Sequence, residues 1–98
     1  MSFKKCKFYT MMINREKMKI EAVQKEGFTD GEFFYYKETY SNNITKWFCI
    51  EPTTGCAVCS DCNTRKEAYN KKEELREQIK SKDKTELINK FNKLLEAV

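Results

Sequence analysis

Histidine is absent from this 98-residue chain, and glycine and proline are scarce, with three and one. Without histidine, catalysis by a Ser/His or Cys/His pair and every histidine-containing metal site are excluded. So few glycines and prolines exclude a collagen-like or low-complexity chain. The sequence also lacks a long apolar run, and its start, Met1–Lys5, lacks the apolar block of a signal peptide. We therefore expect a soluble cytoplasmic protein without a membrane span.

Aromatic residues, by contrast, are plentiful, with seven Phe, five Tyr and one Trp. They supply apolar surface for folding although 35% of the residues are charged and the mean hydropathy is −0.79. A chain of this length predicts one domain, residues 1–98, with a modest core. The net charge is +4, but acidic and basic residues alternate almost everywhere except at Lys4, Lys5 and Lys7. We therefore do not expect direct binding of nucleic acid.

Residues 1–62 predict an antiparallel β-meander, because branched and aromatic segments alternate with turn residues such as Asn14-Arg15 and Asp30-Gly31. Residues 15–26 also fit a helix capped by Asn14, but the two-residue alternation of apolar side chains favours a strand. The run 33–36 consists of four aromatic residues, so two rings would be exposed on one face unless the helices or a partner cover them. The expected strands are Lys5–Ile13, Lys17–Val23, Glu32–Tyr40, Ile44–Glu51 and Cys56–Cys59.

Residues 63–98 predict two helices that form a hairpin packed on one face of the sheet. Thr64 and Glu67 have the spacing of a capping box, and a charged helix extends from there to about Lys80. Asp83 begins a second helix, whose apolar residues recur with the helical period up to Val98. One long bent helix remains an alternative, because neither glycine nor proline separates the two segments.

The five cysteines are the strongest chemical signal in the sequence. Three of them form the pattern C-x-x-C-x-x-C, a spacing that binds zinc or an iron–sulfur cluster. In a reducing compartment a metal is favoured over disulfides. Strand order places Cys49 beside the triplet and Cys6 at the far edge, although a strongly curled sheet could make Cys6 the fourth ligand instead. The expected ligands of a closed, structural Zn²⁺ knuckle are Cys49, Cys56, Cys59 and Cys62.

Two segments carry a resemblance to a known group of proteins. These are Lys46–Gly55, which contains a Trp strand and a Pro-x-Thr-Gly turn, and the helix start Thr64–Ala68. In them the chain resembles small phage and mobile-element proteins that act as anti-CRISPR inhibitors of type II-A effector nucleases. The resemblance covers about residues 32–70 and implies a cysteine-rich, metal-binding member of that group.

The sequence thus predicts an α+β domain with a meander and zinc knuckle in residues 1–62 and a helical hairpin in residues 63–98. We expect no catalytic residues, because the sequence contains no nucleophile–base set and no glycine-rich phosphate loop. The resemblance implies a monomeric protein that binds a CRISPR–Cas nuclease in a bacterial host cell and obstructs the loading of target DNA. A small zinc-dependent nucleic-acid-binding or transcription-accessory protein is the alternative.

Overall fold

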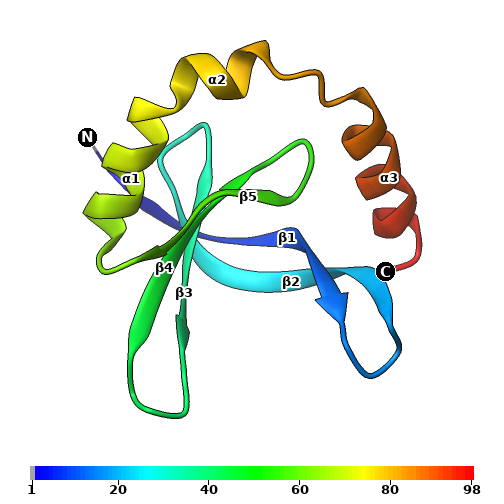
Figure 1. Ribbon diagram of the computed structural model, residues 1–98, viewed down its shortest axis with the longest axis horizontal. Coiled ribbons are helices and arrows are strands. Elements are labelled where there is room, and N and C mark those ends of the chain that lie inside the picture. Colours follow the sequence, from blue (N-terminus) through cyan, green and yellow to red (C-terminus); the bar gives the residue numbers. More distant parts are fainter. Residues whose placement is uncertain (1) are drawn as a thin grey trace.

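The computed structural model describes residues 2–98 as an α+β domain in which an antiparallel sheet is followed by three helices (Figure 1). The sheet has five strands in the order β1-β2-β3-β4-β5. The predicted α+β class and meander are confirmed, and the helical alternative for residues 15–26 is wrong because β2 lies there. The strands are β1 (Lys4–Asn14), β2 (Lys19–Thr29), β3 (Phe34–Thr39), β4 (Thr45–Glu51) and β5 (Cys56–Cys62).

The hairpin of β1 and β2 is the longest element of the sheet, and its two strands pair along their whole length. The side chain of Asn14 begins the connecting turn by accepting hydrogen bonds from the amides of Glu16 and Lys17. On its other side, β2 pairs with β3 only through Phe28 and Thr29. Most of the hairpin is therefore free to bend away from the plane of β3 and β4, as Figure 1 shows.

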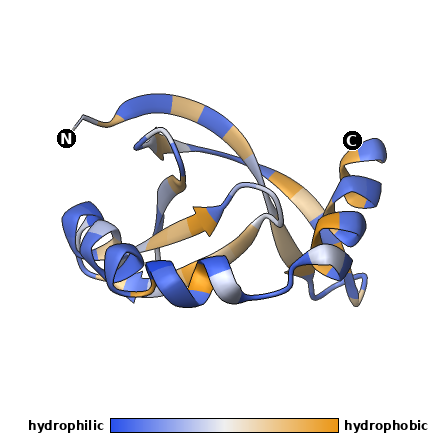
Figure 2. Ribbon diagram, turned by 90° about the horizontal axis from the view of Figure 1, so that it is seen from above, coloured by the Kyte–Doolittle hydropathy of each residue, from blue (hydrophilic) through white to orange (hydrophobic). Residues whose placement is uncertain are grey.

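This bend curls the sheet so that β1 returns to the turn between β4 and β5. The amide of Met11 and the hydroxyl of Thr10 both donate to the carbonyl oxygen of Gly55, each at 2.7 Å. On the inner face of the curl, Phe8 of β1 stacks on Phe34 of β3 with 4.6 Å between the ring centroids. In Figure 2, β1 shows alternating bands of hydrophilic and hydrophobic residues, as a strand with two different faces should.

The aromatic run 33–36 is covered on both faces, so it does not leave the two exposed rings that were expected in the absence of a covering element. Tyr35 is 0% exposed and Tyr36 is 5% exposed. Phe33 and Tyr35 belong to one apolar cluster together with cysteines of β4 and β5, whereas Tyr36 packs with Phe8 in the other cluster. The covering element that sequence reasoning missed is the curled β1, which closes the second face.

The helices do not form the expected hairpin. Helices α1 (Arg65–Glu74) and α2 (Arg76–Ser81) form a bent arm that is interrupted at Leu75, and α3 (Thr85–Glu96) follows after a short connection. Helix α1 packs on β4 and β5, whereas α3 packs on β2, so Figure 1 shows them at opposite sides of the sheet. Phe91 of α3 is buried against Gly55. In the described range 2–98, no helix has the length and apolar character needed to cross a membrane.

Candidate metal centre on β4 and β5

Strand β5 presents its three cysteines on the face of the sheet that also carries Cys49. Every second residue of β4 lies on the same face of the sheet. The residues of β5 that pair with these positions are three residues apart, whereas a regular strand would place them two residues apart. Irregularities in the register, of the kind made by β-bulges, absorb the additional residue in each interval. The partners across the strands are Cys62 with Trp47, Cys59 with Cys49, and Cys56 with Glu51.

Three of these thiols lie together beneath α1. Cys49, Cys59 and Cys62 are 0%, 9% and 5% exposed, and they share an apolar cluster with Tyr35 and Ala68. The thiol of Cys59 lies 3.3 Å from the carbonyl oxygen of Ala68, to which it donates a hydrogen bond. The expected zinc knuckle at the junction of sheet and helix is, in this structure, a bulged strand covered by a helix.

The thiols of Cys49 and Cys59 influence each other across the strand pair. Their mutual hydrogen bond raises the pKa of Cys49, with burial adding to the increase, and lowers the pKa of Cys59. Two thiols in contact lose their protons as a pair, the first easily and the second with difficulty. Burial, followed by the nearby Cys59, raises the pKa of Cys62 to about 11. Of these three thiols, Cys59 therefore loses its proton first, whereas the raised pKa values of Cys49 and Cys62 oppose deprotonation.

The other two cysteines lie apart from this cluster. Cys56 is on the same face, but its thiol points to the carbonyl oxygen of Thr54 at 3.6 Å and lines a cavity next to α2. Cys6 packs against the opposite apolar cluster, which contains Phe8 and Tyr36, and burial raises the pKa of its thiol. The structure thus brings together three of the four expected ligands. It leaves Cys56 opposite Glu51, two residues along β4 from Cys49, and puts Cys6 on the other face.

In the arrangement described for residues 2–98, no three or more His, Cys, Asp or Glu side chains converge on a point that could hold a metal ion. Three of the thiols, those of Cys56, Cys59 and Cys62, instead donate to backbone carbonyl oxygens. Tetrahedral zinc needs four thiolates about 2.3 Å from the ion. Such a site would require these thiols to rotate away from the carbonyls, and Cys56 to move toward Cys49.

A buried ion pair joins α1 to the turn between β2 and β3, and sequence reasoning missed it. Lys72 lies 2.9 Å from Asp30 and 2.7 Å from Glu73, and its side chain is 1% exposed. Its ammonium group also lies 4.3 Å from the centroid of the Tyr69 ring. Lys72 and Asp30 are 42 residues apart in the sequence, and no local spacing pairs them.

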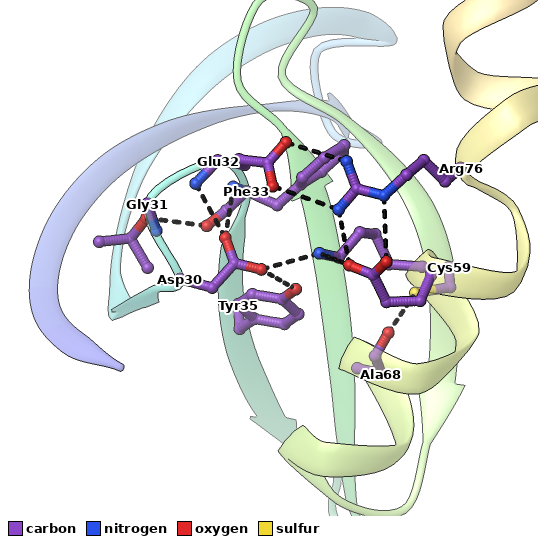
Figure 3. Close-up of polar contacts among 11 residues, drawn as sticks. Asp30, Gly31, Glu32, Phe33, Tyr35, Cys59, Ala68 and Arg76 are labelled. Carbon is purple, nitrogen blue, oxygen red and sulfur yellow. Dashed lines mark hydrogen bonds and ion pairs between the residues drawn. The ribbon is translucent and has the colours of Figure 1, made fainter. Parts of the chain in front are cut away.

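Asp30 is the centre of the polar contacts drawn in Figure 3. Its carboxylate accepts hydrogen bonds from the Tyr35 hydroxyl at 2.6 Å and from the amides of Glu32 and Phe33. Burial by itself would raise its pKa, but these bonds and Lys72 outweigh that effect and lower the pKa to about 2. Arg76 extends the network by binding Glu32 and Glu73.

The turn quoted in the resemblance is held by a second buried carboxylate. Glu51 is 5% exposed and accepts hydrogen bonds from the amides and hydroxyls of Thr53 and Thr54. At the start of α1, the hydroxyl of Thr64 accepts from the amide of Glu67 at 3.0 Å, as the capping box predicts. Both motifs therefore have a structural role in this chain.

No protein-family model matches the sequence, and neither a curated protein nor a solved structure matches the chain.

Proposed function

We propose that this protein is a non-enzymatic binding domain. The observation that supports the proposal is that the buried polar groups of the domain are bonded to one another. Among residues 2–98, every buried side-chain nitrogen or oxygen atom has a hydrogen-bond partner. The buried charges of Asp30, Lys72 and Glu51 are taken up by the ion network and by the turn. Catalytic groups must be accessible to a substrate. These buried charged groups contact only other parts of the chain, so we propose that they stabilise the fold and that the protein acts through its surface.

The partner we propose is a type II-A CRISPR effector nuclease, and the support for this is the resemblance carried by Lys46–Gly55 and Thr64–Ala68. These segments lie on either side of β5: the first contains most of β4 and the turn after it, and the second contains the start of α1. Effector nucleases of this type load target DNA by pairing it with a guide RNA in a positively charged channel. A chain of net charge +4 is a poor mimic of DNA, so we propose that it binds a protein surface and obstructs loading sterically.

A structural zinc ion held by Cys49, Cys56, Cys59 and Cys62 is part of this proposal. The common face of these cysteines and the lowered pKa of the Cys59 thiol support it. Four thiolates leave no open coordination position, so such an ion stabilises the domain and takes no part in a reaction. All four ligands lie on β4 and β5, so the ion would join these two strands immediately before the start of α1 and stabilise the part of the sheet from which the helical arm leaves.

The test is a DNA-cleavage assay with a purified type II-A nuclease, its guide RNA and a target duplex. The inhibitor should co-elute with the nuclease in gel filtration and should stop cleavage when it is added before the DNA. It should have little effect when it is added after the DNA has been loaded. Unchanged cleavage at an excess of the protein, with no co-elution, would show that the proposed partner is wrong. Binding to the duplex alone would favour the nucleic-acid-binding alternative.

A further inference from the structure

Four cations that are dispersed in the sequence gather around the single tryptophan. Lys37 lies over the ring of Trp47, with its ammonium group 5.9 Å from the centroid. Arg65 and Lys66 line the same shallow hollow as Trp47 and Phe3. Lys46 reaches the rim of this hollow by donating to the side chain of Asn63 at 2.7 Å. We call the surface formed by Phe3, Phe28, Lys37, Lys46, Trp47, Arg65 and Lys66 the Trp47 surface.

The cations of the Trp47 surface are not neutralised. None of the four forms an ion pair within residues 2–98, whereas Lys7, Lys25, Lys72 and Arg76 each pair with a carboxylate elsewhere on the molecule. The hollow beside Trp47 has no acidic residue in its lining. Unpaired positive charge around an aromatic ring is an attractive site for a polyanion.

Two aromatic rings pack against Arg65 in this surface. Its guanidinium group lies 4.2 Å from the centroid of Phe3 and 4.4 Å from that of Phe28, within the range of cation–π contacts. A guanidinium group that packs against rings in this way can donate paired hydrogen bonds to a phosphate from its edge.

We propose that the Trp47 surface binds single-stranded nucleic acid. Trp47 would stack on an unpaired base, and the four cations would contact the phosphates on either side of it. A single strand fits better than a duplex, because bases in a duplex are stacked on each other and cannot reach an aromatic side chain. This inference does not depend on the nuclease proposed above, since it concerns a surface and a ligand that can be measured without any nuclease.

The sequence argued against nucleic acid because acidic and basic residues alternate almost everywhere except at Lys4, Lys5 and Lys7. The structure forms the Trp47 surface differently, by bringing the hairpin of β3 and β4 next to the start of α1 (Figure 1). Lys37 and Arg65 come from different elements. Lys37 pairs directly with Trp47 across β3 and β4, and the pairing of Trp47 with Cys62 at the end of β5 brings Arg65 to the same hollow.

The test uses the intrinsic fluorescence of Trp47, which is the only tryptophan in the chain. An unlabelled oligothymidylate of about 15 nucleotides is titrated into the protein at about 50 mM salt. We expect quenching of the emission that saturates and that weakens as salt is added. A fluorescein-labelled copy of the oligonucleotide gives the same affinity by anisotropy.

Two double variants test the location of the site. Lys37→Ala with Lys66→Ala should weaken binding and make its dependence on log salt less steep by about 0.7 for each lost phosphate contact. Lys90→Ala with Lys93→Ala removes the same charge from α3, where neither lysine forms an ion pair with another of the residues 2–98, and should leave binding unchanged. Equal weakening by both variants, or no quenching by the oligonucleotide, would overturn the proposal. Binding of poly-glutamate with the same affinity would also overturn it in favour of an acidic protein partner.

Discussion

Lys72 and Asp30 form an ion pair of 2.9 Å inside the molecule, with side chains that are 1% and 4% exposed. The pair connects α1 to the turn between β2 and β3, which places the helix over the cysteine cluster. A buried pair of this kind adds little compared with apolar residues, but removing one partner leaves the other charge buried and unpaired. The position of α1 on the sheet therefore depends on both residues.

Lys72→Met should lower the free energy of unfolding by about 3–5 kcal/mol, because Asp30 would lose its buried counter-charge. Lys71→Met is the matched control, since Lys71 is exposed and pairs only with Glu74 at 3.7 Å. That variant should cost less than about 1 kcal/mol. Urea denaturation followed by circular dichroism measures both values. Similar stabilities of the two variants would show that the buried pair does not hold α1.

The pKa of Asp30 leads to a prediction for acid pH. Its folded value of about 2 lies below its ordinary value of 3.8, so the stabilisation is fully present above about pH 4. It should be lost as the pH falls toward 2, by about 2 kcal/mol for this group. Asp30→Asn should be less stable at neutral pH and should show a flatter pH dependence below pH 4. An equal acid slope in the wild type and in this variant would contradict the assignment.

Two glycines with positive φ allow the cost of backbone strain to be measured separately from the cost of overpacking the core. A Cβ atom on Gly55 (φ +66°) would clash with the edge of the Phe91 ring, whereas Gly31 (φ +99°) has no atom within 4 Å of such a position. Gly31→Ala should cost about 1–3 kcal/mol from backbone strain alone. Gly55→Ala should cost a further 1–3 kcal/mol or so, because the added methyl overpacks the contact with α3. Thermal unfolding of the two variants gives the difference, and an equal cost would mean that α3 is not seated on Gly55.

Much of the sheet could be predicted from the sequence, because alternation and turn residues are local signals. The five strands and their order follow from them, as does the cap of α1 at Thr64. The curl could not be predicted, since it depends on Phe8 meeting Phe34 from a distant strand. For the same reason Tyr35 and Tyr36, expected in part at the surface, are both buried, so alanine at either position would damage the fold.

In the candidate site, too, the features that depend on local sequence could be predicted, and those that depend on contacts between distant residues could not. The spacing of Cys56, Cys59 and Cys62 pointed to a common function, and strand order put Cys49 beside them. The bulges of β5 that turn these cysteines to one face have no sequence signature, and neither does the rotation of the Cys56 thiol toward Thr54. The pairing of Lys72 with Asp30 depends on how α1 crosses the sheet, which local periodicity does not specify.

Replacing single cysteines should separate ligands from bystanders. Cys59→Ser should lower the melting temperature sharply, since structural zinc contributes on the order of 10 kcal/mol of apparent binding energy in small domains. Cys6→Ser is the control, because Cys6 packs in the opposite cluster, and it should keep both the metal and most of the stability. Loss of metal in Cys6→Ser would make Cys6 the fourth ligand in place of Cys49.

The metal content of the purified protein tests the proposed centre most directly. The protein should be prepared without chelator, and its mass measured under native conditions together with elemental analysis. We predict one zinc ion per chain, released together with four reactive thiols when the protein is unfolded in a chelator. A metal-free mass with all five cysteines reactive in the folded state, or a visible absorption band of an iron–sulfur cluster, would contradict the structural zinc centre.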